Sequence, residues 1–360
     1  MPTITTKLNT PPAQTWNYLK INDVSVELPQ IDGDSLTEDD SQLANIACGC
    51  GEGAARWMFQ IAANRRTIEI EPGDSEENIL VDIDVDQAER SCVDLIVGEG
   101  AQVKVLVIAH GQEDEENLSS ALLRILCKAD SKLELTELVS AGASSTHLSG
   151  IGMELEQGAH AEVKQYSLGA GLSSMGLAAN LVGSNSSLEL ALRYMSRKQE
   201  KLDVNHAVWQ RGTSTKATID ASGVLADHAE KNYRATIDLV QGCKGSAGSE
   251  QETVLVWGDD VINRTLPTIM CSEDDVAGDH GATIGSVSAE QIEYLAARGL
   301  SQDEAELLIA RSVLDDALFH MSNETSREAV LRVARDMLGE EEAAELAETS
   351  AALEGAGSNE

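Results

Sequence analysis

His280 is the residue best placed for chemistry in this sequence. It follows Asp279 and is flanked by Gly278 and Gly281, so the backbone on both sides can approach a bound group closely. An imidazole titrates near neutral pH and is a common metal ligand. These residue types indicate a metal site or a contact with a partner. A purely structural histidine at the joint between two architectures is the alternative.

Cys271 is the second candidate ligand, nine residues before His280. A thiolate and an imidazole both bind iron and zinc. Two ligands do not complete a metal site, so a second chain would have to supply the others. The pair therefore predicts a site shared across a dimer interface.

Cys48-Gly49-Cys50 is the one close cysteine pair. It could bind a metal or carry a persulfide, but no second pair exists to complete four cysteine ligands. Packing of two small side chains in a turn is therefore favoured. The six cysteines are irregularly spaced, which indicates free thiols and a cytoplasmic location rather than a disulfide framework.

Several classes of protein are disfavoured by what the sequence lacks. It has no phosphate-binding loop, no Gly-x-Ser-x-Gly nucleophile motif and no His-Glu-x-x-His zinc motif. The net charge of −35 repels nucleic-acid phosphates and anionic membrane surfaces. No run of 18 apolar residues and no secretory signal is visible. We expect neither a membrane span nor a nucleic-acid partner.

Short strand-like runs, separated by glycine, asparagine or serine, recur between about residues 66 and 285. Five of them share one pattern, and their equivalent apolar positions are 103, 133, 161, 188 and 217. The spacings of 30, 28, 27 and 29 residues, with no helical pattern between them, predict stacked coils of a β-solenoid. A sandwich of antiparallel hairpins is the alternative.

After Gly285 the pattern becomes helical. Ser288 and Gln291 have the spacing of a capping box, and Gly299 lies where that helix should end. The sequence thus predicts four parts: a short N-terminal element at 1–60, a solenoid core at 61–285, a small helical domain at 286–340, and an acidic, disordered tail at 341–360.

A set of motifs lies between about residue 203 and residue 310. They are Asp203-x-x-His206, Gly223-Val224-Leu225-Ala226-Asp227-His228-Ala229, Pro267, Asp279-His280-Gly281-Ala282-Thr283-Ile284-Gly285 and the run from Glu290 to Leu300. Taken alone, the polar cluster Asp203, Asn205 and His206 would be explained equally well by an exposed loop. Together, the motifs resemble the SufB/SufD family, the scaffold subunits of the Suf iron–sulfur cluster assembly machinery.

The resemblance implies a mainly β fold, a right-handed parallel β-helix with a helical C-terminal domain. It implies docking of the ATPase subunit SufC through the C-terminal helices. It also implies pairing with a SufB-like subunit, or with a second copy of this chain, through the end of the β-helix. A transient iron–sulfur cluster would be assembled at that interface, where His280 matches the family's histidine. Whether a flavin takes part is left open.

Three positions depart from the family pattern. SufD relatives often carry a cysteine where this chain has Gly278, and SufB relatives carry an essential cysteine that best matches Gln251. SufB also has a glutamate where this chain has Gly281. The chain is therefore SufD-like and is not expected to build a cluster alone. Cys271 is the candidate substitute for the missing thiol ligand.

The leading hypothesis is a scaffold component that is not an enzyme and that contributes His280 to a shared metal site. One alternative is a β-helix enzyme of the secreted type that acts on a polysaccharide through a groove of clustered carboxylates. Here the acidic residues are spread along the chain. Another alternative is a purely structural partner with no metal role, since Gly278 replaces a thiol.

Overall fold

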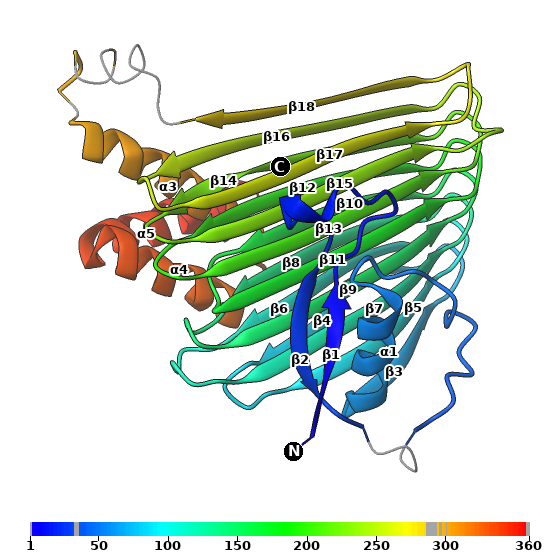
Figure 1. The fold of residues 1–360 in the computed structure, drawn as a ribbon, viewed down its shortest axis with the longest axis horizontal. Coiled ribbons are helices and arrows are strands. Elements are labelled where there is room, and N and C mark those ends of the chain that lie inside the picture. The colour runs from blue at the N-terminus through cyan, green and yellow to red at the C-terminus, as the bar shows by residue number, and fades with distance from the viewer. Residues whose placement is uncertain (1, 32–35, 286–293, 295–296, 300, 358–360) are drawn as a thin grey trace.

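A computed structural model describes residues 2–31, 36–285, 294, 297–299 and 301–357. The chain is mainly β, and its body is a solenoid of two parallel sheets with eight strands each (Figure 1). The odd-numbered sheet contains β3 (Asn64–Ile70), β5 (Arg90–Val97), β7 (Leu118–Cys127), β9 (Thr146–Leu155), β11 (Leu172–Leu181), β13 (Lys201–Gln210), β15 (Glu230–Leu239) and β17 (Ile262–Cys271). The even-numbered sheet contains β4 (Ser75–Asp84), β6 (Gln102–His110), β8 (Lys132–Ser140), β10 (His160–Ser167), β12 (Ser187–Ser196), β14 (Lys216–Ala226), β16 (Ala247–Trp257) and β18 (Ala277–Gly285).

The stacking register confirms the predicted solenoid. Leu133 pairs with both Val103 and Ala161, and Leu188 pairs with both Ala161 and Ala217. The five equivalent positions read from the sequence therefore lie one above another. Every neighbouring pair in the two long sheets is parallel, so the antiparallel sandwich is wrong.

One turn of each coil needs a left-handed backbone. Asp130, Asn185 and Ser214 adopt φ values of 57°, 61° and 56° there, and Gly100 and Gly158 both adopt 67°. Glycine, asparagine and aspartate tolerate this conformation best. The turn requirement explains why these residue types recur at the coil period.

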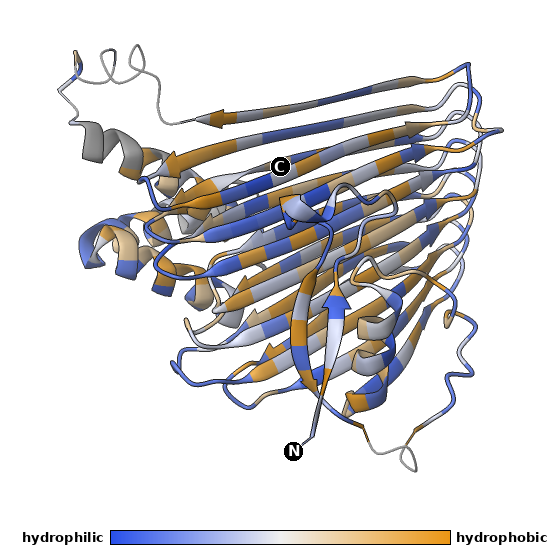
Figure 2. Ribbon diagram, in the orientation of Figure 1, coloured by the Kyte–Doolittle hydropathy of each residue, from blue (hydrophilic) through white to orange (hydrophobic). Residues whose placement is uncertain are grey.

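Alternate side chains of each strand point into the space between the two sheets, which we call the lumen. Figure 2 shows the resulting alternation of hydrophobic and hydrophilic residues along the strands. Val105, Leu135 and Leu190 are among the buried side chains of this core. Burial of stacked aliphatic rows stabilises each coil only through its neighbours.

The N-terminal element crosses the outer face of the odd-numbered sheet (Figure 1). It comprises β1 (Thr3–Leu8), the 3-10 turn η1 (Asn17–Leu19), β2 (Val24–Pro29) and α1 (Glu52–Ile61). Cys48 and Cys50 are free and buried against this face. A Cβ atom at Gly176 would lie 2.2 Å from the Cys50 amide nitrogen, so the loop can approach only where the sheet has no side chain. The pair is packed in the way that the sequence favoured.

Three described helices cover the outer face of the even-numbered sheet: α3 (Gln302–Phe319), α4 (Glu324–Leu338) and α5 (Glu340–Gly357). They pack on Ile108, Leu138 and Tyr166. The capping box at Ser288 and Gln291 lies outside the described residues.

The expectation of a disordered tail at 341–360 is wrong for the residues up to Gly357, which are helical. Alanine and glutamate are strong helix formers. Ala343 and Leu346 give α5 an apolar contact with the other helices. Local propensity and this packing outweigh the acidic charge on which the expectation rested.

Candidate functional site at the end of the solenoid

The last coil consists of β17 and β18. Within the part of the chain that the structure describes, each of these strands pairs on one side only, β17 with β15 and β18 with β16. Most residues of β18 are exposed, whereas β14, which has a neighbouring strand on each side in the same sheet, is mostly buried. An unpaired strand edge offers backbone N–H and C=O groups to another strand.

His280 lies on β18 and faces the lumen. It pairs in register with Glu250 of β16, whose side chain is fully buried between the sheets. In-register residues on neighbouring parallel strands share a face. His280 is nevertheless exposed, because no described coil stacks on β18.

Cys271 also occupies a lumen register, because it pairs with the buried Leu239. It is the last residue of β17 and is exposed, and its Sγ donates to the Glu273 carbonyl oxygen at 3.2 Å. The structure thus brings Cys271 and His280 to the same coil. Among the described residues, however, no three histidine, cysteine, aspartate or glutamate side chains are grouped as a metal site.

Sequence reasoning missed a buried charged cluster directly below this coil. Lys231 and Glu252 form an ion pair inside the lumen, with side chains 0% and 1% exposed. Thr265 donates to Glu252 Oε2 at 2.7 Å, and Tyr194 donates at 3.2 Å to Oε1, the oxygen that Lys231 also contacts. Burial lowers the pKa of Lys231, and the Glu252 carboxylate opposes that shift.

Glu250 is the second buried carboxylate of β16, and its environment differs from that of Glu252. Burial raises its pKa to about 8, and the nearby Glu252 charge adds to this effect. Neither oxygen of Glu250 makes a hydrogen bond of acceptable geometry. The coil register is the feature that could have identified both residues as inward-facing, because Glu250 stacks on Ile219 and Glu252 stacks on Ala221.

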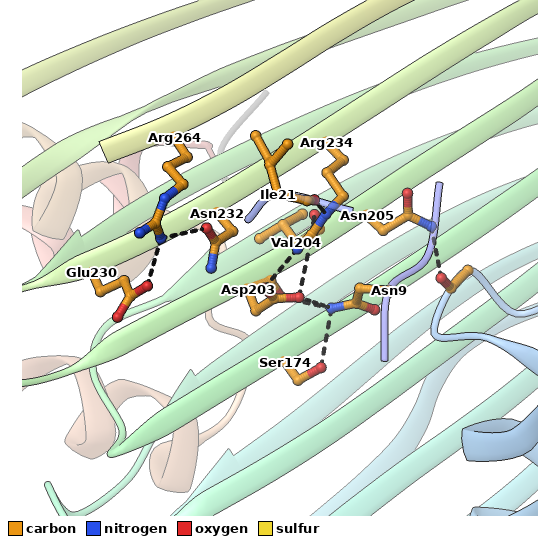
Figure 3. Close-up of polar contacts among 11 residues, drawn as sticks. Asn9, Ile21, Ser174, Asp203, Val204, Asn205, Glu230, Asn232, Arg234 and Arg264 are labelled. Carbon is orange, nitrogen blue, oxygen red and sulfur yellow. Dashed lines mark hydrogen bonds and ion pairs between the residues drawn. The ribbon is translucent and has the colours of Figure 1, made fainter. Parts of the chain in front are cut away.

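Asp203 and Asn205 are buried strand residues of β13, so the exposed-loop explanation is wrong. Figure 3 shows Asp203 between Arg234 and Asn9. Arg234 donates to both Asp203 oxygens, at 2.9 and 3.0 Å, and to the Ile21 carbonyl oxygen. Asn205 donates to the Gly49 carbonyl oxygen at 2.7 Å. These contacts fasten the N-terminal element to the outer face of the sheet.

His206 points the opposite way, into the lumen. Its Nε2–H donates to Gln165 Oε1 at 2.8 Å, and Gln165 Nε2 donates to Glu137 at 2.6 Å. Burial lowers the pKa of His206 to about 3, so the ring is neutral. The Asp203-x-x-His206 motif thus spans two faces of one strand and does not converge on a single site.

Outside the lumen, the last coil carries a half-buried polar group. Arg264 of β17 donates to Glu230 at 2.6 Å and to Asn232 at 3.0 Å (Figure 3).

Among the helices of the described residues, none combines the length and the hydropathy of a membrane span.

Comparison with known proteins places these features in a family context. Residues 82–313 match the family model described as "SUF system FeS cluster assembly, SufBD core domain". The chain is 24% identical over 240 residues to the iron–sulfur cluster assembly protein SufD of Escherichia coli, covering 66% of this chain and 56% of that protein. It is 25% identical over 202 residues to an iron–sulfur cluster assembly SufBD family protein of Mycobacterium leprae, covering 56% of this chain and 23% of that protein. The matches therefore span about a quarter to a half of these relatives.

Proposed function

We propose, since this chain belongs to the SufBD family of iron–sulfur cluster assembly proteins, that it is a SufD-like scaffold subunit of a Suf complex. In this role it is not an enzyme. It contributes residues to a transient iron–sulfur cluster that forms at a subunit interface in the cytoplasm. Iron and sulfide are cargo of the complex rather than a resident cofactor.

The position of His280 carries this proposal. It is exposed, faces the lumen, and lies on the terminal strand of the solenoid. An imidazole there can bind a metal that a second chain also binds. Beside it, Gly278 and Gly281 carry no thiol or carboxylate, and the Gln251 side chain lies on the opposite face with Gly281. The remaining ligands would come from the partner, with Cys271 as a candidate thiol at the adjoining turn.

The free edges of β17 and β18 support the proposed partner. A SufB-like subunit, or a second copy of this chain, can continue both sheets by adding strands to these edges. Such pairing would enclose His280 at the interface and would cover the exposed face of the last coil. It would also satisfy the edge N–H and C=O groups, which favours a specific partner over open aggregation.

The C-terminal helices are the proposed docking site for a SufC-like ATPase. Helix α3 exposes Leu308 and Phe319, by 51% and 56%, although its other face packs on the sheet. These two exposed apolar side chains are the proposed contact points for the ATPase. We expect Leu308→Asp to reduce co-purification of the ATPase, with Leu36→Asp, an exposed site on the N-terminal element, as the matched control.

The polysaccharide-enzyme alternative needs paired carboxylates in an open groove. The two carboxylates of β16 next to the last coil, Glu250 and Glu252, are buried inside the solenoid. The purely structural alternative gives no reason for an exposed histidine at the end of a lumen register that holds aliphatic side chains from β4 to β14. Neither alternative is favoured by a specific feature of the site.

Complementation in cells tests the proposed function. His280→Ala should fold normally, because the side chain is exposed, yet iron–sulfur enzyme activity should fall to background in cells that carry only this variant. His110→Ala, on β6 far from the last coil, is the control and should retain activity. Normal iron–sulfur enzyme activity with His280→Ala would contradict the proposed function.

A further inference from the structure

One column of lumen residues changes character at the end of the solenoid. From β4 to β14 it consists of buried aliphatic side chains that stack in register, and in β16 and β18 it continues with Glu250 and His280. The full column is Ile79, Val105, Leu135, Val163, Leu190, Ile219, Glu250 and His280.

Glu250 is unusual even among the buried polar groups of the lumen. Its side chain is 0% exposed, and neither carboxylate oxygen has a hydrogen-bond partner among the described groups. The Thr268 backbone amide lies close enough to favour the charged carboxylate but does not reach hydrogen-bond geometry. A buried carboxylate without a partner costs free energy unless something binds it.

The protein's own cations do not fill this need. Lys231 is the nearby lumen cation, and its ammonium group is bound by Glu252, Thr265 and Tyr194. The Arg264 guanidinium lies on the outer face with Glu230 and Asn232. Glu250 lies on the same face of its sheet as His280, which pairs with it in register on the neighbouring strand, about 4.8 Å away.

We propose that Glu250 and His280 together bind one divalent metal ion at the open end of the solenoid. The two carboxylate oxygens and one imidazole nitrogen supply three donor atoms, a set that suits iron, zinc or manganese. Water or the partner subunit completes the coordination. The identification of the metal as ferrous cargo rests on the proposed function, whereas the ligand pair rests on the column alone.

The donor set argues for a bare metal ion over a basic side chain of the partner. A lysine or arginine of the partner would satisfy Glu250 but would gain little from the imidazole of His280. A divalent metal uses both groups at once. The site therefore lets the chain hold iron through oxygen and nitrogen before any thiolate ligand arrives.

Calorimetric titration of the full-length chain with Co²⁺, an air-stable divalent probe, tests the proposal. Wild-type protein should bind one ion, and Glu250→Gln and His280→Ala should each weaken binding by at least about tenfold. Glu137→Gln is the matched control, because Glu137 is another buried lumen carboxylate but is fully bound by Ser149 and Gln165. It should bind Co²⁺ as the wild type does.

Glu250→Asp keeps the carboxylate but shortens the side chain by one methylene, so it should also weaken Co²⁺ binding. It provides a second test in case Glu250→Gln does not fold. Absence of Co²⁺ binding by the wild type, or unchanged binding by both Glu250 variants, would overturn the proposal. Loss of Co²⁺ binding in His280→Ala but in neither Glu250 variant would also overturn the proposed ligand pair, but it would not contradict the proposed scaffold role. Failure of that role is instead seen in the cell complementation assay.

Discussion

In the first coils of the solenoid, the lumen register that ends at His280 holds Ile79, Val105 and Leu135, whereas in the last two coils it holds Glu250 and His280. The aliphatic part of this register follows the rule that stacked coils bury apolar rows. The two polar residues at its end break that rule next to an exposed strand edge. Residues that break local packing rules concentrate at functional sites. Under the proposed function, the contrast separates the coils that stabilise the fold from the coils that would hold the cluster.

The buried ion pair gives the largest expected effect. Lys231→Met should destabilise the protein by about 3–5 kcal/mol, because it leaves Glu252 charged and uncompensated in the lumen. Denaturant unfolding measures this. Lys104→Met is the control, since Lys104 forms an exposed pair with Glu134 at 3.6 Å and should change stability by less than about 1 kcal/mol. Equal effects of the two variants would remove the distinction between lumen and surface charges.

The aliphatic part of the register should respond as an ordinary close-packed core. Leu135→Ala should cost about 2–5 kcal/mol, through lost burial and the cavity that remains. The same denaturant experiment reports it. A loss below about 1 kcal/mol would show that the first coils are loosely packed, contrary to the contrast drawn above.

Extending the aliphatic column should stabilise the fold and remove the site. Glu250→Leu places leucine above Ile219, and removal of the unpartnered carboxylate should raise the unfolding free energy by about 1–3 kcal/mol above pH 8. Thermal and denaturant unfolding at pH 9 check the gain. Destabilisation by this variant would mean that Glu250 has a structural partner.

The neutral lumen histidine predicts a pH dependence. The pKa of His206 is lowered to about 3 in the folded state, against an ordinary value near 6.5. Between these values the unfolded chain binds the extra proton. The contribution to stability is therefore complete above pH 6.5 and is lost as the pH falls toward 3, by up to about 1.4 kcal/mol per pH unit.

Between pH 6.5 and 5, the unfolding free energy of His206→Gln should fall less steeply with decreasing pH than that of the wild type. The slopes should differ by up to about 1.4 kcal/mol per pH unit. Groups with raised pKa values, such as Glu200, act in the opposite direction but are common to both proteins and cancel in the difference. Identical slopes for the two proteins would show that His206 titrates normally in the fold.

The fold was accessible from the sequence because the coil period fixes which apolar residues stack, as Val103, Leu133 and Ala161 do. His280 was accessible from its glycine-flanked position. Glu250 was not, because it lies in the wholly polar run Ser249-Glu250-Gln251-Glu252, where alternation cannot separate inward from outward. Only its register with Ile219 places it in the lumen.

Long-range partners account for the other errors. The sequence around Asp203 does not reveal Arg234 or the Ile21 carbonyl oxygen, which bury it under the N-terminal element. Charge alone predicts a disordered acidic tail, because the sequence does not reveal the contact of Leu346 with the other helices. Both cases concern contacts between segments that are far apart in the chain or belong to different elements.

The most direct test of the central claim, that the open end of the solenoid is the assembly site, is the iron and sulfide content of the complex purified with its partners. Complexes containing His280→Ala should assemble with normal subunit composition but retain at least about tenfold less iron than complexes with the wild-type chain or with His110→Ala. Equal iron and sulfide content in all three complexes would contradict the account.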